Sequence, residues 1–156
     1  MHSSKLFSCR DCQKSQVCCT GLDIVPIPLL KKDLHVFKEH TLSTPSGNVI
    51  RPTKDGTCPF LTDDRMCSLI RKDKDLRPIY CRVYPLVGDG ERILLDIFCP
   101  CSPKILEKHI LGDTASHKFL VRARKLLGKY GEKMALVVGH TIAQWEVPIT
   151  IDLDKL

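Results

Sequence analysis

Cysteine content is the feature that constrains this chain most. Nine cysteines occur in 156 residues, and four of them fall within "CRDCQKSQVCC", which runs from Cys9 to Cys19. The count is odd, so the cysteines cannot all pair with one another in disulfides. Adjacent cysteines such as Cys18 and Cys19 are also poor partners for one disulfide, because their Cβ atoms point apart. Three kinds of site are compatible with such clustering: a disulfide cluster, a redox site and a metal site.

The expected compartment favours the metal site. No apolar run approaches the ~18 residues of a membrane span, and the start of the chain, "MHSSKLFSC", lacks the apolar segment of a secretory signal. We therefore expect a cytoplasmic protein with no membrane partner, and a reducing cytoplasm disfavours structural disulfides. The pair Cys9 and Cys12 has redox spacing but no βαβ context, which weakens the redox interpretation.

The spacing of the cysteines suits thiolate ligation. The full pattern is C-x2-C-x5-C-C-x38-C-x8-C-x13-C-x17-C-x-C, and its C-x2-C opening lets two sulfurs of one turn reach the same ion. We expect eight of the nine cysteines to be ligands. Cys101 is either a ninth candidate or the true eighth ligand in place of Cys99. The predicted metal ligands are Cys9, Cys12, Cys18, Cys19, Cys58, Cys67, Cys81, Cys99 and Cys101.

The identity of the metal is left open by this pattern. Sites made only of sulfur hold zinc or iron–sulfur clusters, and the spacing matches no ferredoxin run. One closed four-sulfur site, two sites and a single larger cluster all fit nine cysteines. The cofactor is therefore predicted to be zinc or an iron–sulfur cluster, with metal ions as the expected partners and any protein partner, substrate or catalysis undetermined.

Length and patterning predict a small single domain over 1–156 of the α+β class. Residues 9–101 form the expected cysteine-cluster region, with metal-binding loops and a short hairpin-containing sheet, and residues 102–156 form a mostly helical C-terminal half. The expected elements up to residue 99 are an edge strand at 23–28, a helix at 28–40, a loop at 41–56, a hairpin at 57–70, a short helix at 77–85 and a strand at 91–99. After them we expect a helix at 103–111 capped by Ser102, a helix at 114–130 capped by Asp113, and an edge strand at 147–153.

Two motifs resemble those of a known family. "CPFL" from Cys58, with Cys67 downstream, and "RPIYCRVYP" at 77–85 are similar to the motifs of the YkgJ-type cysteine-cluster family, described as a zinc- or iron-chelating domain. The first cluster differs in having five residues, rather than two, between Cys12 and Cys18. The resemblance covers residues 9–101 and implies chelation. The family also includes longer proteins similar to flagellin lysine N-methylases. The resemblance therefore implies an alternative function, as an iron–sulfur enzyme or as an accessory protein for lysine methylation.

Arginines beside the predicted ligands have a predicted role in this motif. A divalent ion held by four thiolates carries about two negative charges, which nearby donors stabilise. We expect Arg77 and Arg82, near Cys81, to donate to thiolates or to neutralise the site. The competing interpretation is that both arginines are surface residues whose stems cover the core.

The basic excess does not by itself indicate a nucleic-acid partner. The formal charge is +6 with every cysteine neutral, and eight thiolates around two divalent ions would bring it to about +2. Basic residues gather between Lys118 and Lys133, which raises a third function, a metal-scaffolded nucleic-acid-binding protein. A solvated helix face explains the same residues more simply, and no aromatic side chains alternate with them to stack on bases.

Overall fold

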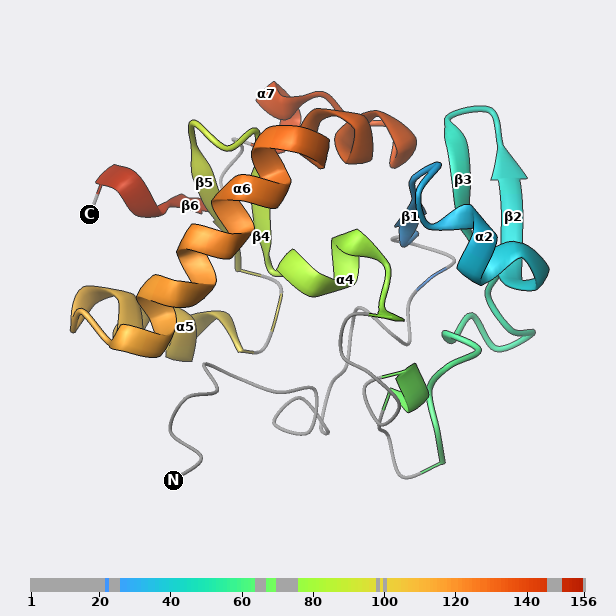
Figure 1. Ribbon diagram of the computed structural model, residues 1–156, viewed down its shortest axis with the longest axis horizontal. Coiled ribbons are helices and arrows are strands. Elements are labelled where there is room, and N and C mark those ends of the chain that lie inside the picture. Colours follow the sequence, from blue (N-terminus) through green and yellow to red (C-terminus); the bar gives the residue numbers. More distant parts are fainter. Residues whose placement is uncertain are drawn as a thin grey trace.

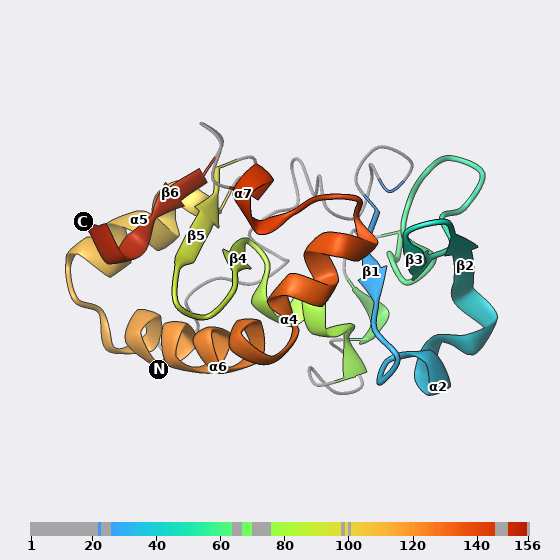
Figure 2. The same cartoon turned by 90° about the horizontal axis from the view of Figure 1, so that it is seen from above.

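The chain has the predicted α+β class. The computed structural model describes residues 22, 26–63, 67–69, 76–97, 99, 101–145 and 150–155. Within these residues it forms two three-stranded antiparallel sheets and one long C-terminal helix. The two sheets lie on either side of α4 (Ile79–Val83), and α6 (Thr114–Val137) contacts strands of both (Figures 1 and 2).

The first sheet differs from the sequence prediction. Its order is β1 (Pro28–Leu29), β3 (Gly47–Ile50), β2 (Thr41–Thr44), so β1 is an edge strand. The edge strand predicted over 23–28 shares only Pro28 with β1, and residues 23–25 lie outside the described part of the chain. The loop predicted over 41–56 is wrong for its first part, where β2 and β3 form a hairpin. No residue of β2 is buried, so the hydrophobic alternation that marks a strand is missing from its sequence.

The first helix is shorter than predicted. A helix was expected over 28–40, but α2 covers Leu34–Phe37 and the 3-10 turn η1 covers Lys38–His40. The preceding residues pair with β3 instead, and the carboxylate of Asp33 accepts the backbone N–H of Leu30 at 3.0 Å. This local bond closes a turn in place of a first helical turn, as Asp side chains commonly do.

The second sheet pairs three short strands in an antiparallel arrangement. Its order is β4 (Leu86–Gly88), β5 (Ile93–Asp96), β6 (Thr150–Asp152). The strand predicted over 91–99 and the C-terminal edge strand are both confirmed, with shorter bounds. Asp89 closes the turn between β4 and β5, because its carboxylate accepts the N–H groups of Glu91 and Arg92, each at 3.0 Å.

Two helices cover the second sheet. The first is α5 (Ser102–Ile110), which has Cys101 at its N-cap, one residue earlier than the predicted cap. In α6 the predicted cap is confirmed, since the carboxylate of Asp113 accepts the N–H of Ser116 at 3.0 Å. This helix runs seven residues past the expected end at Tyr130 and is followed by α7 (Ile142–Trp145). Among the residues described, no helix is long and apolar enough to cross a membrane.

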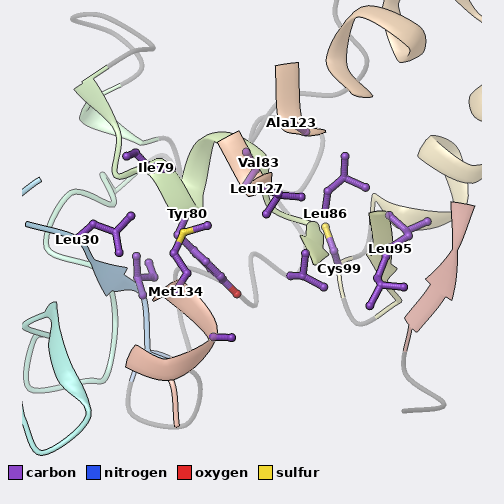
Figure 3. Close-up of a cluster of buried hydrophobic side chains, with 14 of the residues drawn as sticks. Leu30, Ile79, Tyr80, Val83, Leu86, Leu95, Cys99, Ala123, Leu127 and Met134 are labelled. Atoms are coloured by element: carbon purple, nitrogen blue, oxygen red, sulfur yellow. The ribbon is translucent and has the colours of Figure 1, made fainter. Parts of the chain in front are cut away.

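One buried cluster joins both sheets and the helices. Its members include Ile50 of β3, Val83 of α4, Leu95 of β5 and Leu127 of α6, each no more than 1% exposed. Figure 3 shows part of this cluster, with Cys99 close to Leu95. The predicted ligand Cys99 therefore belongs to the same packed interior that holds the fold together.

Candidate metal centre

Five of the nine predicted ligands lie in the described part of the chain. Their side chains are thiols rather than disulfides, as ligation requires. Cys58, Cys99 and Cys101 are buried, with 7%, 4% and 5% of their surface exposed, and Cys67 and Cys81 are half-buried. The four cysteines of the first cluster, Cys9, Cys12, Cys18 and Cys19, lie outside the described residues.

Cys58 and Cys67 lie on two segments that fold back on each other. The N–H of Ser68 donates to the carbonyl of Phe60 at 2.8 Å, and Leu61 forms a single antiparallel bridge with Cys67. The hairpin predicted over 57–70 is therefore reduced to one bridge in the described residues. The N–H of Leu61 donates to the carbonyl of Cys58 at 3.1 Å, which fixes the turn between the cysteine and the bridge.

A backbone bond ties the start of the described chain to this turn. The N–H of Leu22 donates to the carbonyl of Gly56 at 2.9 Å, and the Leu22 side chain is buried in the core. Leu22 comes three residues after Cys19, and Gly56 comes two residues before Cys58. Leu22 is thus attached beside the second group of predicted ligands.

Cys81 lies in α4, where both predicted arginines contact the backbone. The Nη1 of Arg77 donates to the carbonyl of Cys81 at 3.2 Å, and the Nε of Arg82 donates to the carbonyl of Arg77 at 3.1 Å. These bonds place each guanidinium beside the helix turn that carries the thiol. Donation from either arginine to a thiolate remains a prediction.

Cys99 and Cys101 lie between β5 and α5. The carbonyl of Cys99 accepts the N–H of Ser102 at 2.9 Å, and the carbonyl of Cys101 accepts the N–H of Ile105 at 3.1 Å. Cys101 is the N-cap of a nine-residue helix.

Two carboxylates beside α4 were not found by sequence reasoning. Asp33 is 4% exposed, and its carboxylate accepts backbone N–H groups of Leu30 and Ile79, the second at the start of α4. Burial raises the pKa of Asp33 above its usual value, against the opposing effects of these bonds and of Arg82. A single aspartate beside two lysines carries no sequence signal for such a position.

Asp96 is the second carboxylate, at the other end of α4. Its Oδ2 accepts the hydroxyl of Tyr84 at 2.9 Å. Burial raises the pKa of Tyr84, with further contributions from Tyr80, Asp96 and Cys99, so its hydroxyl keeps its proton. Tyr84 lies in the motif at 77–85, and nothing in the sequence pointed to its bond with Asp96.

The described residues supply sulfurs in small groups only. No set of three or more histidine, cysteine, aspartate or glutamate side chains in this part of the chain is arranged to hold a metal ion. Their thiol chemistry suits zinc or iron, but a four-thiolate site would also need cysteines of the first cluster.

Comparison with known proteins returns no match. Neither a protein-family model, nor a curated protein, nor a solved structure matches the chain. The similarity to the YkgJ-type cysteine-cluster family rests on the motifs around Cys58 and Cys81 and stays a prediction.

Proposed function

We propose that this protein binds zinc or an iron–sulfur cluster through cysteine thiolates contributed by both the first cluster and the described part of the chain. The observation that carries the proposal is the backbone bond between Leu22 and Gly56. It supports the proposal because it limits how far the first cluster can lie from Cys58.

Chain length sets that limit. Each residue spans at most about 3.6 Å, so the Cα of Cys19 lies within about 11 Å of the Cα of Leu22. Cys58 is two residues from the bonded Gly56, and Cys67 pairs with Leu61 in the same turn. Side chains that start this close can converge on one ion without rearranging the core. Cys18, Cys19, Cys58 and Cys67 are therefore the first set to test as a four-thiolate site.

The remaining cysteines form the second group to test. Cys99 and Cys101, separated by one residue, precede α5, and Cys81 lies in α4, on the motif that resembles the chelating family. In this proposal Cys9 and Cys12 form a four-thiolate site with Cys81 and either Cys99 or Cys101, because no three of the described side chains are arranged to hold one ion. One larger cluster that includes all nine sulfurs is the alternative, and metal stoichiometry separates the two arrangements.

The experiment is purification of the full chain without oxygen, followed by metal analysis and absorption spectroscopy. Zinc gives a colourless protein, whereas an iron–sulfur cluster gives a brown one with sulfur-to-iron absorption. Protein that is folded and contains neither metal would overturn the proposal. Cys18→Ser with Cys19→Ser should remove at least one metal equivalent. Ser15→Ala, in the same segment, should leave the metal content unchanged.

Nucleic-acid binding is the second candidate, supported by one surface feature. Five cations of α6 are exposed and recur at intervals of three or four residues, which places them in one row along the helix. Glu132 is the one exposed acidic residue of the helix. The cations of this row are Lys118, Arg122, Lys125, Lys129 and Lys133. Such a row matches the repeated charge of a phosphate backbone.

Salt dependence tests this second function. If all five cations contact phosphates of duplex DNA, the logarithm of the binding constant should fall with the logarithm of salt concentration with a slope of about −4.5. Replacing Lys118, Lys125 and Lys129 with glutamine should weaken binding and lower the slope. The matched control replaces Lys31, Lys32 and Lys38, which are exposed and lie just before and after α2. Equal losses in the two triple variants would remove the candidate.

A further inference from the structure

The side chain of Tyr84 joins the end of α4 to the end of β5. Tyr84 follows α4 directly, and its N–H donates to the carbonyl of Tyr80 at 2.9 Å. The two rings pack with centroids 5.4 Å apart. With its backbone and ring fixed in this way, the hydroxyl of Tyr84 donates to Oδ2 of Asp96 at 2.9 Å.

Asp96 is itself held in place from both sides. Its N–H donates to the carbonyl of Pro85 at 2.9 Å, which extends the pairing of β4 with β5 by one residue. Its own carbonyl accepts the hydroxyl of Ser102 at 2.5 Å. Asp96 therefore links the segment after α4, the end of the sheet and the first turn of α5.

These bonds close a short loop that carries two predicted ligands. Ser102, 2% exposed, bonds through its hydroxyl to Asp96 and through its N–H to the carbonyl of Cys99. The loop between Asp96 and Ser102 thus has both ends joined, and the thiols of Cys99 and Cys101 are buried within it. The directions of these two thiols depend on the hydrogen bonds that close the loop.

We infer that Tyr84 and Asp96 are positioning residues for the thiols of Cys99 and Cys101, an inference that rests on the metal-binding function proposed above. The hydroxyl of Tyr84 anchors Asp96 through its carboxylate, and the backbone carbonyl of Asp96 accepts the hydroxyl of Ser102. The N–H of Ser102 in turn bonds to the carbonyl of Cys99. Residues that orient metal ligands without touching the ion change metal affinity by about 10- to 100-fold when they are replaced. The same size of effect is expected here.

The test compares metal retention in full-length protein as purified. Tyr84→Phe keeps the ring and removes only the bond to Asp96. The chelator concentration that extracts half of the bound zinc or iron should fall by about 10- to 100-fold. Tyr130→Phe is the matched control, because Tyr130 is also half-buried against the core and lies in α6. It should retain metal like the wild type.

Two further variants separate positioning from simple packing. Asp96→Asn keeps an oxygen that accepts the Tyr84 hydroxyl, so metal retention should stay near the wild-type level. Asp96→Ala removes the acceptor and should release metal as readily as Tyr84→Phe. Ser102→Ala breaks the next bond of the same chain and keeps the inference testable if Tyr84→Phe fails to fold. Equal losses in Asp96→Asn and Asp96→Ala would contradict the positioning role.

A metal-independent measurement separates this inference from the proposed function. With chelator present, alkylation of Cys99 and Cys101, followed by peptide mass spectrometry, should be faster in Tyr84→Phe than in the wild type. Alkylation of Cys58, which is about equally buried, should not change. Wild-type protein that binds no metal would overturn the proposed function and the inference together. Wild-type protein that binds metal, with Tyr84→Phe retaining it equally and reacting equally slowly, would overturn the inference alone.

Discussion

The α6 half of the molecule and the turn around Cys58 are stabilised in different ways. On α6, Ala123, Leu127 and Met134 are each 1% exposed and pack into the common core. Around Cys58 the chain is held by backbone bonds, among them those from Leu22 to Gly56 and from Ser68 to Phe60, with one strand bridge. Apolar burial can stabilise α6 without a ligand. Under the proposed function, the turn around Cys58 gains much of its order from a bound ion.

We expect metal removal to have the largest effect of these tests and to loosen only the turn around Cys58. A chelator should raise hydrogen exchange at the amides of Leu22 and Ser68 to the rate of exposed amides. The amides of Leu127 and Met134 in α6 should stay protected, because this helix packs through apolar side chains against strands of both sheets. Hydrogen exchange measured by mass spectrometry on the full chain, with and without chelator, checks this contrast. Loss of protection in both regions together would show that the molecule unfolds as one unit.

A pair of glycines on α6 tests how the first region is packed. A Cβ at Gly131 would overlap the carbonyl oxygen of Gly88 at the end of β4. Gly131→Ala should therefore lower the free energy of unfolding by about 1–3 kcal/mol despite the better helix propensity of alanine. At Gly128 a Cβ would meet no atom nearer than 3.9 Å, so Gly128→Ala should raise the free energy of unfolding by up to about 1 kcal/mol.

Urea unfolding of both glycine variants measures this difference. The two positions lie one turn apart on the same helix, so they share its intrinsic propensities and differ in the contact with β4. A loss at Gly128→Ala equal to that at Gly131→Ala would show that the close approach of α6 to β4 does not distinguish them.

Sequence reasoning succeeded where local patterns determine the structure. The cap at Asp113, the buried strand around Ile93 and the short helix between Pro78 and Pro85 each depend on neighbouring residues, and each is confirmed. The hairpin of β2 and β3 was missed because its outer strand is polar and mostly exposed. Its inner strand β3 also pairs with β1, which lies on the other side of β3 and precedes α2 in the sequence.

The candidate ligands could be predicted from the sequence, but the hydrogen bonds around them could not. Cysteine spacing identifies the sulfurs, since ligand type follows from residue type. The bond between Tyr84 and Asp96 joins residues 12 apart on different elements, and that between Leu22 and Gly56 spans a longer interval. Such contacts depend on how elements pack, and no periodicity in one sequence encodes them.

The smallest effect concerns Asp33, the buried carboxylate between the first sheet and α4. Because burial raises its pKa in the folded protein, the folded state binds a proton more readily than the unfolded chain. Stability from this group is therefore fully present below its unfolded pKa of 3.8 and is lost as the pH rises through the folded value. Asp33→Asn keeps an acceptor for the N–H groups of Leu30 and Ile79 and removes the titration.

Unfolding by urea between pH 4 and neutral pH, with chelator present throughout, tests this sign. The wild type should lose stability relative to Asp33→Asn as the pH increases, by less than the loss expected for Gly131→Ala. Asp55→Asn, at an exposed position, controls for the general effect of removing one negative charge. A stability difference that stays constant with pH would mean that Asp33 has the same proton affinity in both states. A difference that changes in the opposite direction would mean that the bonds from Leu30 and Ile79 outweigh the cost of burial.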